Sequence, residues 1–208
     1  MTKGPEPLDA DARCEEKRLI GRARRGDKEA LRRLIDLHKD RVYAFVRRMV
    51  RNHHDAEEVV QDAFLKAFAA LDSFSTQYRF STWLFTIAYR LCLNHLRRKH
   101  SLTGEVDFQT VAYEAPDAAT LTAQSDDARR LRSVVWGAVE QLTPAQRAAV
   151  VLFYRHEHSC REIAQVLELP VATVKSHLHR ARAKLKELLE PIVASDGSDL
   201  RILADQAG

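Results

Sequence analysis

The chain has 208 residues, of which 45% are hydrophobic and 30% are charged, so it can build both a buried core and a solvated surface. This balance excludes wholesale disorder, and 7 glycines with 6 prolines are too few for a β-sandwich with many tight turns. No stretch approaches the ~18 consecutive apolar residues of a membrane span. The N-terminal stretch MTKGPEPLDADA lacks the apolar core of a signal peptide. We therefore expect a cytoplasmic protein that does not insert into a membrane.

The net charge of +4 is unevenly distributed. Residues 15–100 hold 19 Lys and Arg against 11 Asp and Glu, and residues 128–190 hold 11 against 6. Between them, residues 101–127 carry 6 acids and no Lys or Arg, and they lack a sustained helical period. Two basic blocks joined by an acidic one favour two modules that touch a polyanion, with a flexible linker between them. A chance excess of bases on helix surfaces would give a similar balance, so charge alone does not decide the function.

The first amphipathic helix is expected over residues 28–50, where apolar side chains recur at three- and four-residue steps. Gly26 and Asp27 lie just before it. Gly26 can end a preceding helix over residues 16–25, and the Asp27 side chain can cap the new one.

The next helix is expected to open at Asp55, with Glu58 as its capping-box partner. At 100° per residue, its buried stripe separates from an acidic face that carries an exposed leucine. In a basic module, such a face is typical of a binding site for a basic protein partner, although a solvated helix face is the commoner explanation for any single acid. The buried stripe comprises Ala56, Val60, Ala63, Phe64, Ala67 and Leu71, and the acidic face comprises Glu57, Glu58, Gln61, Asp62 and Leu65.

Residues 74–80 (FSTQYRF) form a polar loop that carries aromatic side chains, and Ser81 and Thr82 start a long helix that runs to about Arg98. This helix is apolar on two sides, so it is either sandwiched between other elements or offers one side to a ligand. Aromatic side chains interleaved with arginines suit single-stranded nucleic acid, because bases stack on the rings and phosphates meet the cations. These side chains are Tyr78, Arg79, Phe80, Trp83, Arg90, Asn94, Arg97 and Arg98.

The sequence of residues 128–190 predicts four helices. Two of them begin with capping boxes, in which Thr143 pairs with Gln146 and Ser159 pairs with Glu162. A short helix, a tight turn and a longer basic helix at the end of this module are typical of a helix-turn-helix.

The last helix, over residues 171–189, carries small side chains on the face opposite its apolar stripe. Small side chains allow a helix to enter a DNA major groove, which is ~12 Å wide, and donors beside them can reach bases and phosphates. The outer face comprises Ala172, Ser176, His179 and Ala183, with Thr173 and Arg180 on one flank and Lys175 and Lys186 on the other.

Three stretches in this order resemble the bacterial extracytoplasmic-function (ECF) sigma factors of the sigma-70 superfamily. They are DAEEVVQDAFLKAF (Asp55–Phe68), FSTWLFTIAYRLCLNHLRRK (Phe80–Lys99) and TVKSHLHRARAKLKELL (Thr173–Leu189). The resemblance implies an all-α fold with two helical domains, a sigma region 2-like bundle and a sigma region 4-like helix-turn-helix, joined by a linker.

The domain boundaries expected from this resemblance are 15–100 for the first domain and 128–190 for the second. The acidic linker occupies residues 101–127 and a C-terminal tail occupies residues 191–208. The tails 1–13 and 191–208 lie outside the resemblance and have no functional interpretation.

The resemblance also implies a protein without catalytic activity or cofactor that binds core RNA polymerase and directs it to promoters, with an anti-sigma factor as a further partner. Core polymerase binding then falls to Asp55, Glu57, Glu58, Gln61, Asp62 and Leu65. Recognition of the single-stranded minus-ten element falls to Ser75, Gln77, Tyr78, Arg79, Trp83, Arg90, Asn94, Arg97 and Arg98. Recognition of the duplex minus-thirty-five element falls to Ala172, Thr173, Lys175, Ser176, His177, His179, Arg180 and Arg182.

Two other function classes remain open at this point. An enzyme or zinc site is suggested by His53–His54 and by residues 156–160 (HEHSC), although the second cluster lacks the HExxH spacing and polar loop residues are the more ordinary interpretation. No Gly-rich phosphate loop or nucleophile elbow is visible. The alternative is a stand-alone helix-turn-helix transcription regulator, which would leave the acidic helix face and the aromatic loop without a role.

Overall fold

The computed structural model describes residues 10–103 and 126–196, and these residues form helices and no strand, which confirms the all-α prediction. The helices of the first part are α1 (Ala10–Ala23), α2 (Lys28–Val50), α3 (His53–Ala69), the 3-10 turn η1 (Leu71–Ser73) and α4 (Phe80–Thr103). Those of the second part are α5 (Asp126–Glu140), α6 (Pro144–Val150), the π-helical turn η3 (Val151–Arg155), α7 (Cys160–Leu167) and α8 (Val171–Asp196).

The junction between α1 and α2 follows the predicted chemistry. Gly26 adopts φ 82°, a left-handed conformation that glycine enters without strain, and so it ends the first helical segment. The Asp27 carboxylate accepts hydrogen bonds from the backbone N–H groups of Glu29 (3.0 Å) and Ala30 (3.2 Å) and thereby caps α2. α1 itself begins earlier than expected, at Ala10.

The start of α3 differs from the prediction. Asn52, not Asp55, is the N-cap, and its side-chain oxygen accepts from the Asp55 N–H at 3.1 Å. Asn and Asp cap helices about equally well, so the earlier of the two takes the position and Asp55 falls within the first turn. The buried stripe is also shifted at one position, because Val59 is buried whereas Val60 is half-buried.

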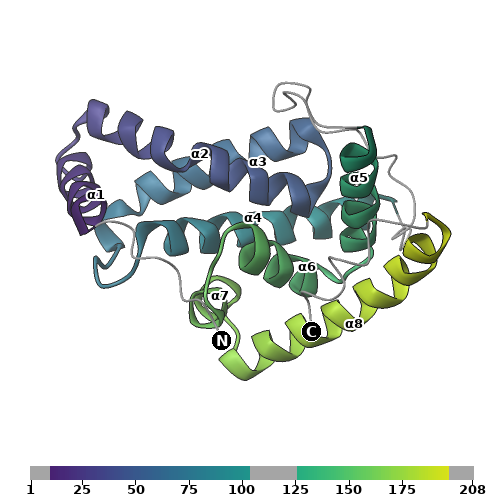
Figure 1. Cartoon of the computed structure of the whole chain (residues 1–208). Coiled ribbons are helices and arrows are strands. Elements are labelled where there is room, and N and C mark those ends of the chain that lie inside the picture. The colour runs from purple at the N-terminus through teal and green to yellow at the C-terminus, as the bar shows by residue number, and fades with distance from the viewer. Residues whose placement is uncertain (1–9, 104–125, 197–208) are drawn as a thin grey trace.

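α4 is the central element of the structure (Figure 1). It packs against α2 and α3 on one side and against α7 of the second part on the other. Phe85 of α4 and Phe45 of α2 are almost fully buried and meet edge to face at 5.3 Å, and burial of such a ring contributes about 1.5–3 kcal/mol. α4 is therefore sandwiched between helices of the first part and α7.

The second part is built as its capping boxes predict. The Thr143 hydroxyl accepts from the Gln146 N–H at 3.4 Å, the Ser159 hydroxyl accepts from the Glu162 N–H at 3.3 Å, and the reciprocal bonds are present in both. The core stripe of α8 is buried at Val174, Leu178 and Ala181 and half-buried at Leu185 and Leu188. α8 extends beyond the predicted end and continues through Pro191 to Asp196.

Several sequence interpretations fall partly or wholly outside the described residues. Most of the expected linker, residues 104–125, lies there, as do residues 1–9 and 197–208. The three cysteines are all described and free, and Cys92 is buried. None of the helices in the described ranges has the length and apolarity that a bilayer crossing requires.

Candidate nucleic-acid interface

The acidic face predicted for residues 55–65 is present on α3. Glu58, Gln61 and Leu65 are exposed, and Leu65 leaves 68% of its surface in solvent. Asp62 is half-buried, and the Glu57 carboxylate lies 3.4 Å from the His53 ring. α3 therefore presents an apolar contact point among acids.

Asp55 is placed differently from the rest of this set. Its carboxylate lies 3.1 Å from the His95 ring nitrogen and 3.9 Å from the Lys99 ammonium, both on α4. Asp55 thus ties the start of α3 to α4.

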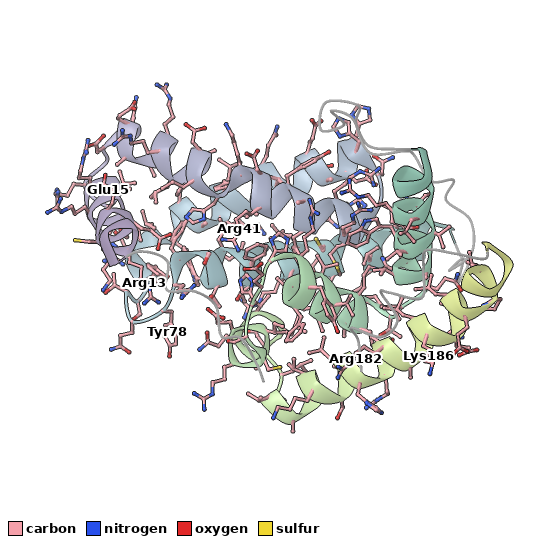
Figure 2. All side chains as sticks on the ribbon, viewed as in Figure 1. Arg13, Glu15, Arg41, Tyr78, Arg182 and Lys186 are labelled. Atoms are coloured by element: carbon pink, nitrogen blue, oxygen red, sulfur yellow. The ribbon has the colours of Figure 1, made fainter. Side chains whose placement is uncertain are left out.

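The loop before α4 exposes three of the predicted minus-ten residues, Ser75, Gln77 and Tyr78. Tyr78 leaves 56% of its surface in solvent and lies at the edge of the molecule (Figure 2). The loop is held in place at its start, because its first residue, Phe74, is buried and the Arg24 guanidinium donates a hydrogen bond to the Phe74 carbonyl. A rigid loop with an exposed ring offers a stacking platform for a base.

Trp83 has a mixed environment. Its ring is half-buried and its centroid lies 5.0 Å from that of Phe74 and 5.7 Å from that of Phe80. It closes the aromatic core beneath the loop and leaves part of its surface accessible.

A small pocket lies between α1 and this loop. Its lining includes Arg13, Glu16 and Lys17 of α1 together with Gln77 and Tyr78 of the loop. The sequence did not predict that α1 lines this pocket, because the helical periodicity of residues 16–25 gives no indication of which loop the helix will face.

The arginines predicted for minus-ten recognition fall into two groups. Arg97 and Arg98 are exposed near the end of α4, as is Asn94. Arg79 and Arg90 instead form ion pairs with the second part of the protein.

Arg90 donates from Nε to the Glu168 carboxylate at 3.1 Å and also contacts it through Nη2, and this hydrogen bonding raises the pKa of the guanidinium. Arg79 Nε lies 3.5 Å from Glu162 Oε1. Burial would raise the pKa of Glu162, but hydrogen bonds from Ser159 and the positive charge of Arg79 hold it below its ordinary value. Glu162 lies in the first turn of α7 and Glu168 is its C-cap, so two arginines expected to meet DNA are paired with the helix-turn-helix. We call Arg79–Glu162 and Arg90–Glu168 the bridging ion pairs.

The outer face of α8 carries the predicted minus-thirty-five residues. Thr173 and His177 are half-buried, and the Ser176 hydroxyl donates to the Ala172 carbonyl at 3.0 Å within the helix. Figure 2 marks Arg182 and, one turn further on, Lys186 along this helix. The exposed members of the set are Ala172, Lys175, Ser176, His179, Arg180 and Arg182.

The histidine-rich stretch does not resemble a metal centre. His156 and His158 are buried against Phe85, with ring centroids 5.1 Å from the Phe85 ring in each case, and His158 Nδ1 lies 3.1 Å from the His156 carbonyl. Among residues 10–103 and 126–196, no group of three or more His, Cys, Asp or Glu side chains is arranged to hold a metal ion.

Comparison with known proteins identifies both parts. Residues 34–101 match the family model of Sigma-70 region 2, and residues 132–185 match that of Sigma-70 region 4. The ECF RNA polymerase sigma factor SigW of Bacillus subtilis is 32% identical over 85% of this chain and 97% of its own length. The ECF RNA polymerase sigma-E factor of Escherichia coli K12 is 31% identical over 84% of this chain and 94% of its own.

Two solved structures have a similar fold. CnrH in complex with the cytosolic domain of CnrY matches with a TM-score of 0.63 and 28% identity over 85% of this chain and 97% of that one. The sigma factor RpoE in complex with the anti-sigma factor NepR from Bartonella quintana matches with a TM-score of 0.64 and 26% identity over 76% of this chain and 96% of that one. Since the region 2 match covers the first part, a stand-alone helix-turn-helix regulator is not favoured. The chain belongs to the ECF RNA polymerase sigma factors of the sigma-70 family.

Proposed function

We propose that this sigma factor binds core RNA polymerase through the exposed face of α3 and directs it to promoters through two DNA-binding surfaces. The observation that carries the proposal is the exposure of Leu65 among acids on α3, in a chain whose first part is otherwise basic. Apolar contact gives affinity at a protein interface, while surrounding charge selects a partner of opposite charge. Glu58, Gln61 and Asp62 supply that charge and polarity, and Asp55 acts by holding α3 against α4.

The minus-ten element is assigned to the loop before α4 and to α4 itself. Ser75, Gln77 and Tyr78 would contact a single-stranded base, with Tyr78 as its stacking partner. Arg79, Arg90, Arg97 and Arg98 would meet the phosphates, with Asn94 beside them, and Trp83 would support the loop from below.

Recognition of the minus-thirty-five element, as duplex DNA, is assigned to α8. Its small residues Ala172 and Ser176 allow close approach to the major groove, and Arg180 can form a bidentate contact with a guanine. Lys175 and Arg182 would meet phosphates, which position the helix without reading sequence.

Sigma factors initiate transcription without chemistry of their own, and we propose the same for this chain, with no cofactor. It would act in the cytoplasm, where polymerase and chromosome lie. The similar structures of CnrH with CnrY and of RpoE with NepR support an anti-sigma factor as a further partner.

The test is to combine the purified protein with core RNA polymerase and to sequence the transcripts initiated on fragmented genomic DNA. Discrete start sites that share two spaced upstream motifs are expected. No complex and no initiation by a well-folded protein would contradict the proposal. A stand-alone regulator would instead give the same DNA footprint with and without core polymerase.

A further inference from the structure

The pocket between α1 and the loop before α4 has walls of different chemistry. The loop contributes Gln77 and the exposed ring of Tyr78, which the proposed function assigns to a single-stranded base. α1 contributes Arg13 and Lys17, which are four residues apart and therefore lie on one face of the helix. Figure 2 shows Arg13 and Tyr78 close to each other at the same edge of the molecule. A nucleotide that stacks its base on Tyr78 would therefore meet two cations of α1.

The acids of α1 do not neutralise these two cations. The Glu15 carboxylate lies 3.8 Å from the Arg33 guanidinium, and the Glu16 carboxylate lies 3.0 Å from the His38 ring, so both acids face partners on α2. Among the side chains that the structure describes, no carboxylate forms an ion pair with either cation, and both cations are exposed. An anion can therefore bind at this wall of the pocket without first breaking an ion pair, unlike at the arginines of the bridging ion pairs.

The two walls of the pocket are held against each other. Leu19 and Ile20 of α1 are almost fully buried, and Ile20 also lines the pocket. Arg24, just after α1, donates from Nε to the Leu71 carbonyl at 3.1 Å and through Nη2 to the Phe74 carbonyl at the start of the loop. Because these contacts fix α1 relative to the loop, a ligand that touches both walls pays little for ordering them.

We propose that α1 is a further DNA-contacting element of this sigma factor, and that Arg13 and Lys17 bind the backbone phosphate beside the base that stacks on Tyr78. The proposal rests on the assignment of Tyr78 to the minus-ten element under the proposed function. The match to the Sigma-70 region 2 model begins at residue 34 and so does not include α1. Phosphate contacts fix the register of a strand without reading its sequence, so α1 positions the base that the loop holds.

The test compares two doubly substituted full-length proteins that lose the same two positive charges. The first is Arg13→Gln with Lys17→Gln, which removes both cations from the pocket. The control is Arg18→Gln with Arg25→Gln, at two exposed arginines, on α1 and in the turn after it, that do not line the pocket. Glutamine is a good helix former and none of the four positions is buried, so both variants should melt at the wild-type temperature.

The probe is a fluorescein-labelled single-stranded DNA 12-mer with the non-template sequence of a minus-ten region, taken from a start site that the wild-type holoenzyme uses. Its binding to each holoenzyme is followed by anisotropy at several salt concentrations. The first variant is expected to bind roughly 3- to 10-fold more weakly than the wild type, as suits two exposed cations. Its slope of log affinity against log salt should become shallower by about 0.7, because one phosphate contact is lost. Equal losses in the variant and the control would overturn the proposal, because the loss would then reflect net charge alone.

A scan of the probe locates the contact. In each of a series of probes, one phosphate is replaced by an uncharged methylphosphonate. The wild type and the control should lose affinity at the phosphate beside the base that stacks on Tyr78, whereas the first variant should lose nothing there and should keep its losses elsewhere. A first variant with the same profile as the wild type would overturn the proposal, because its two cations would then not contact the strand.

Tyr78→Ala identifies the stacked base and separates this proposal from the proposed function. An abasic site at that base should weaken binding of the wild type but not of Tyr78→Ala. If Tyr78→Ala behaves in this way while the first variant binds as the wild type does, only the α1 contact is wrong. If no abasic position depends on Tyr78, or if the wild-type holoenzyme does not initiate, the assignment of the loop to promoter DNA is wrong, and the α1 contact fails with it.

Discussion

Arg147 on α6 donates from Nη1 to the Met49 carbonyl in the last turn of α2 at 3.3 Å. The same guanidinium donates through Nη2 to the carbonyls of Glu140 (2.5 Å) and Leu142 (3.2 Å). Arg147 is buried, and burial together with the charge of Arg51 lowers its pKa to about 10, which leaves it charged at neutral pH. A single buried cation thus connects carbonyls at the end of α2 to the start of the second part, where helix ends leave acceptors without partners.

Arg147→Met should strongly destabilise the folded protein. Methionine fills much of the space but donates nothing, so three carbonyls lose a charged donor, with an expected loss of about 2–4 kcal/mol in the free energy of unfolding. Urea unfolding followed by circular dichroism measures it. Arg155→Met is the matched control, because Arg155 is exposed on η3 and should change stability by no more than about 0.5 kcal/mol. Equal midpoints for the two variants would show that the buried contacts are not stabilising.

Acid should destabilise the folded protein through His156. Burial lowers the pKa of His156 to about 3, with Arg41, His158 and Arg155 adding to the effect, so the ring is neutral in the folded protein at pH 5–7. The pKa of the neighbouring His158 is also lowered by burial, although Glu162 opposes the shift.

The direction of this pH dependence follows from the number of protons that the folded and unfolded states bind. In the unfolded chain a histidine titrates near pH 6.5, so between pH 6.5 and 3 the unfolded state holds more protons and stability falls as the pH falls. His156 alone should lower the free energy of unfolding by about 2 kcal/mol between pH 7 and pH 5. Urea unfolding at both pH values measures the loss. His156→Phe, whose ring can pack against Phe45 and Phe85, should reduce the loss, and exposed His54→Gln should not. A loss that His156→Phe leaves unchanged would rule out this histidine as its source.

Local sequence patterns predicted the helices well, but not what covers them. Residues 28–50 form a helix with the predicted bounds because Gly26 and Asp27 determine its start through neighbouring atoms only. Asp55 was wrong as a cap because Asn52, three residues earlier, offers the same chemistry. Periodicity showed that α4 is apolar on two sides, but not that α7 of the second part packs against it.

The buried Arg147 illustrates the same limit. Its partner Met49 lies 98 positions away in the sequence, and nothing around Arg147 distinguishes it from a solvated arginine beside an apolar stripe. Arg79 and Arg90 were predicted as free to meet DNA for the same reason, because their acidic partners Glu162 and Glu168 belong to the other part of the chain.

Glu58→Lys with Asp62→Lys should abolish binding to core polymerase. Reversal of two charges on the α3 face turns an attraction to a basic partner into repulsion, while the positions are exposed or half-buried and the helix can accommodate lysine. Co-purification with tagged core polymerase measures binding, and a thermal melt checks the fold. Glu29→Lys with Asp36→Lys on α2 makes the same charge change and should co-purify normally. Undiminished co-purification of the α3 variant would show that this face is not the contact.

Arg180→Ala should weaken promoter use by about 1–3 kcal/mol if Arg180 reads a base in the minus-thirty-five element. Arg180 is exposed on the outer face of α8, beside the small residues that allow approach to the groove. The measurement is holoenzyme transcription from a cognate promoter and from the same promoter with single base changes in its upstream element. A base contact gives a loss confined to one base pair, because the variant no longer distinguishes the correct base there. Lys186→Ala, about two turns further along α8 and ion-paired with Glu190, should leave the base preference intact. A loss that is uniform across all the templates would instead make Arg180 a phosphate contact, which positions α8 without reading the sequence.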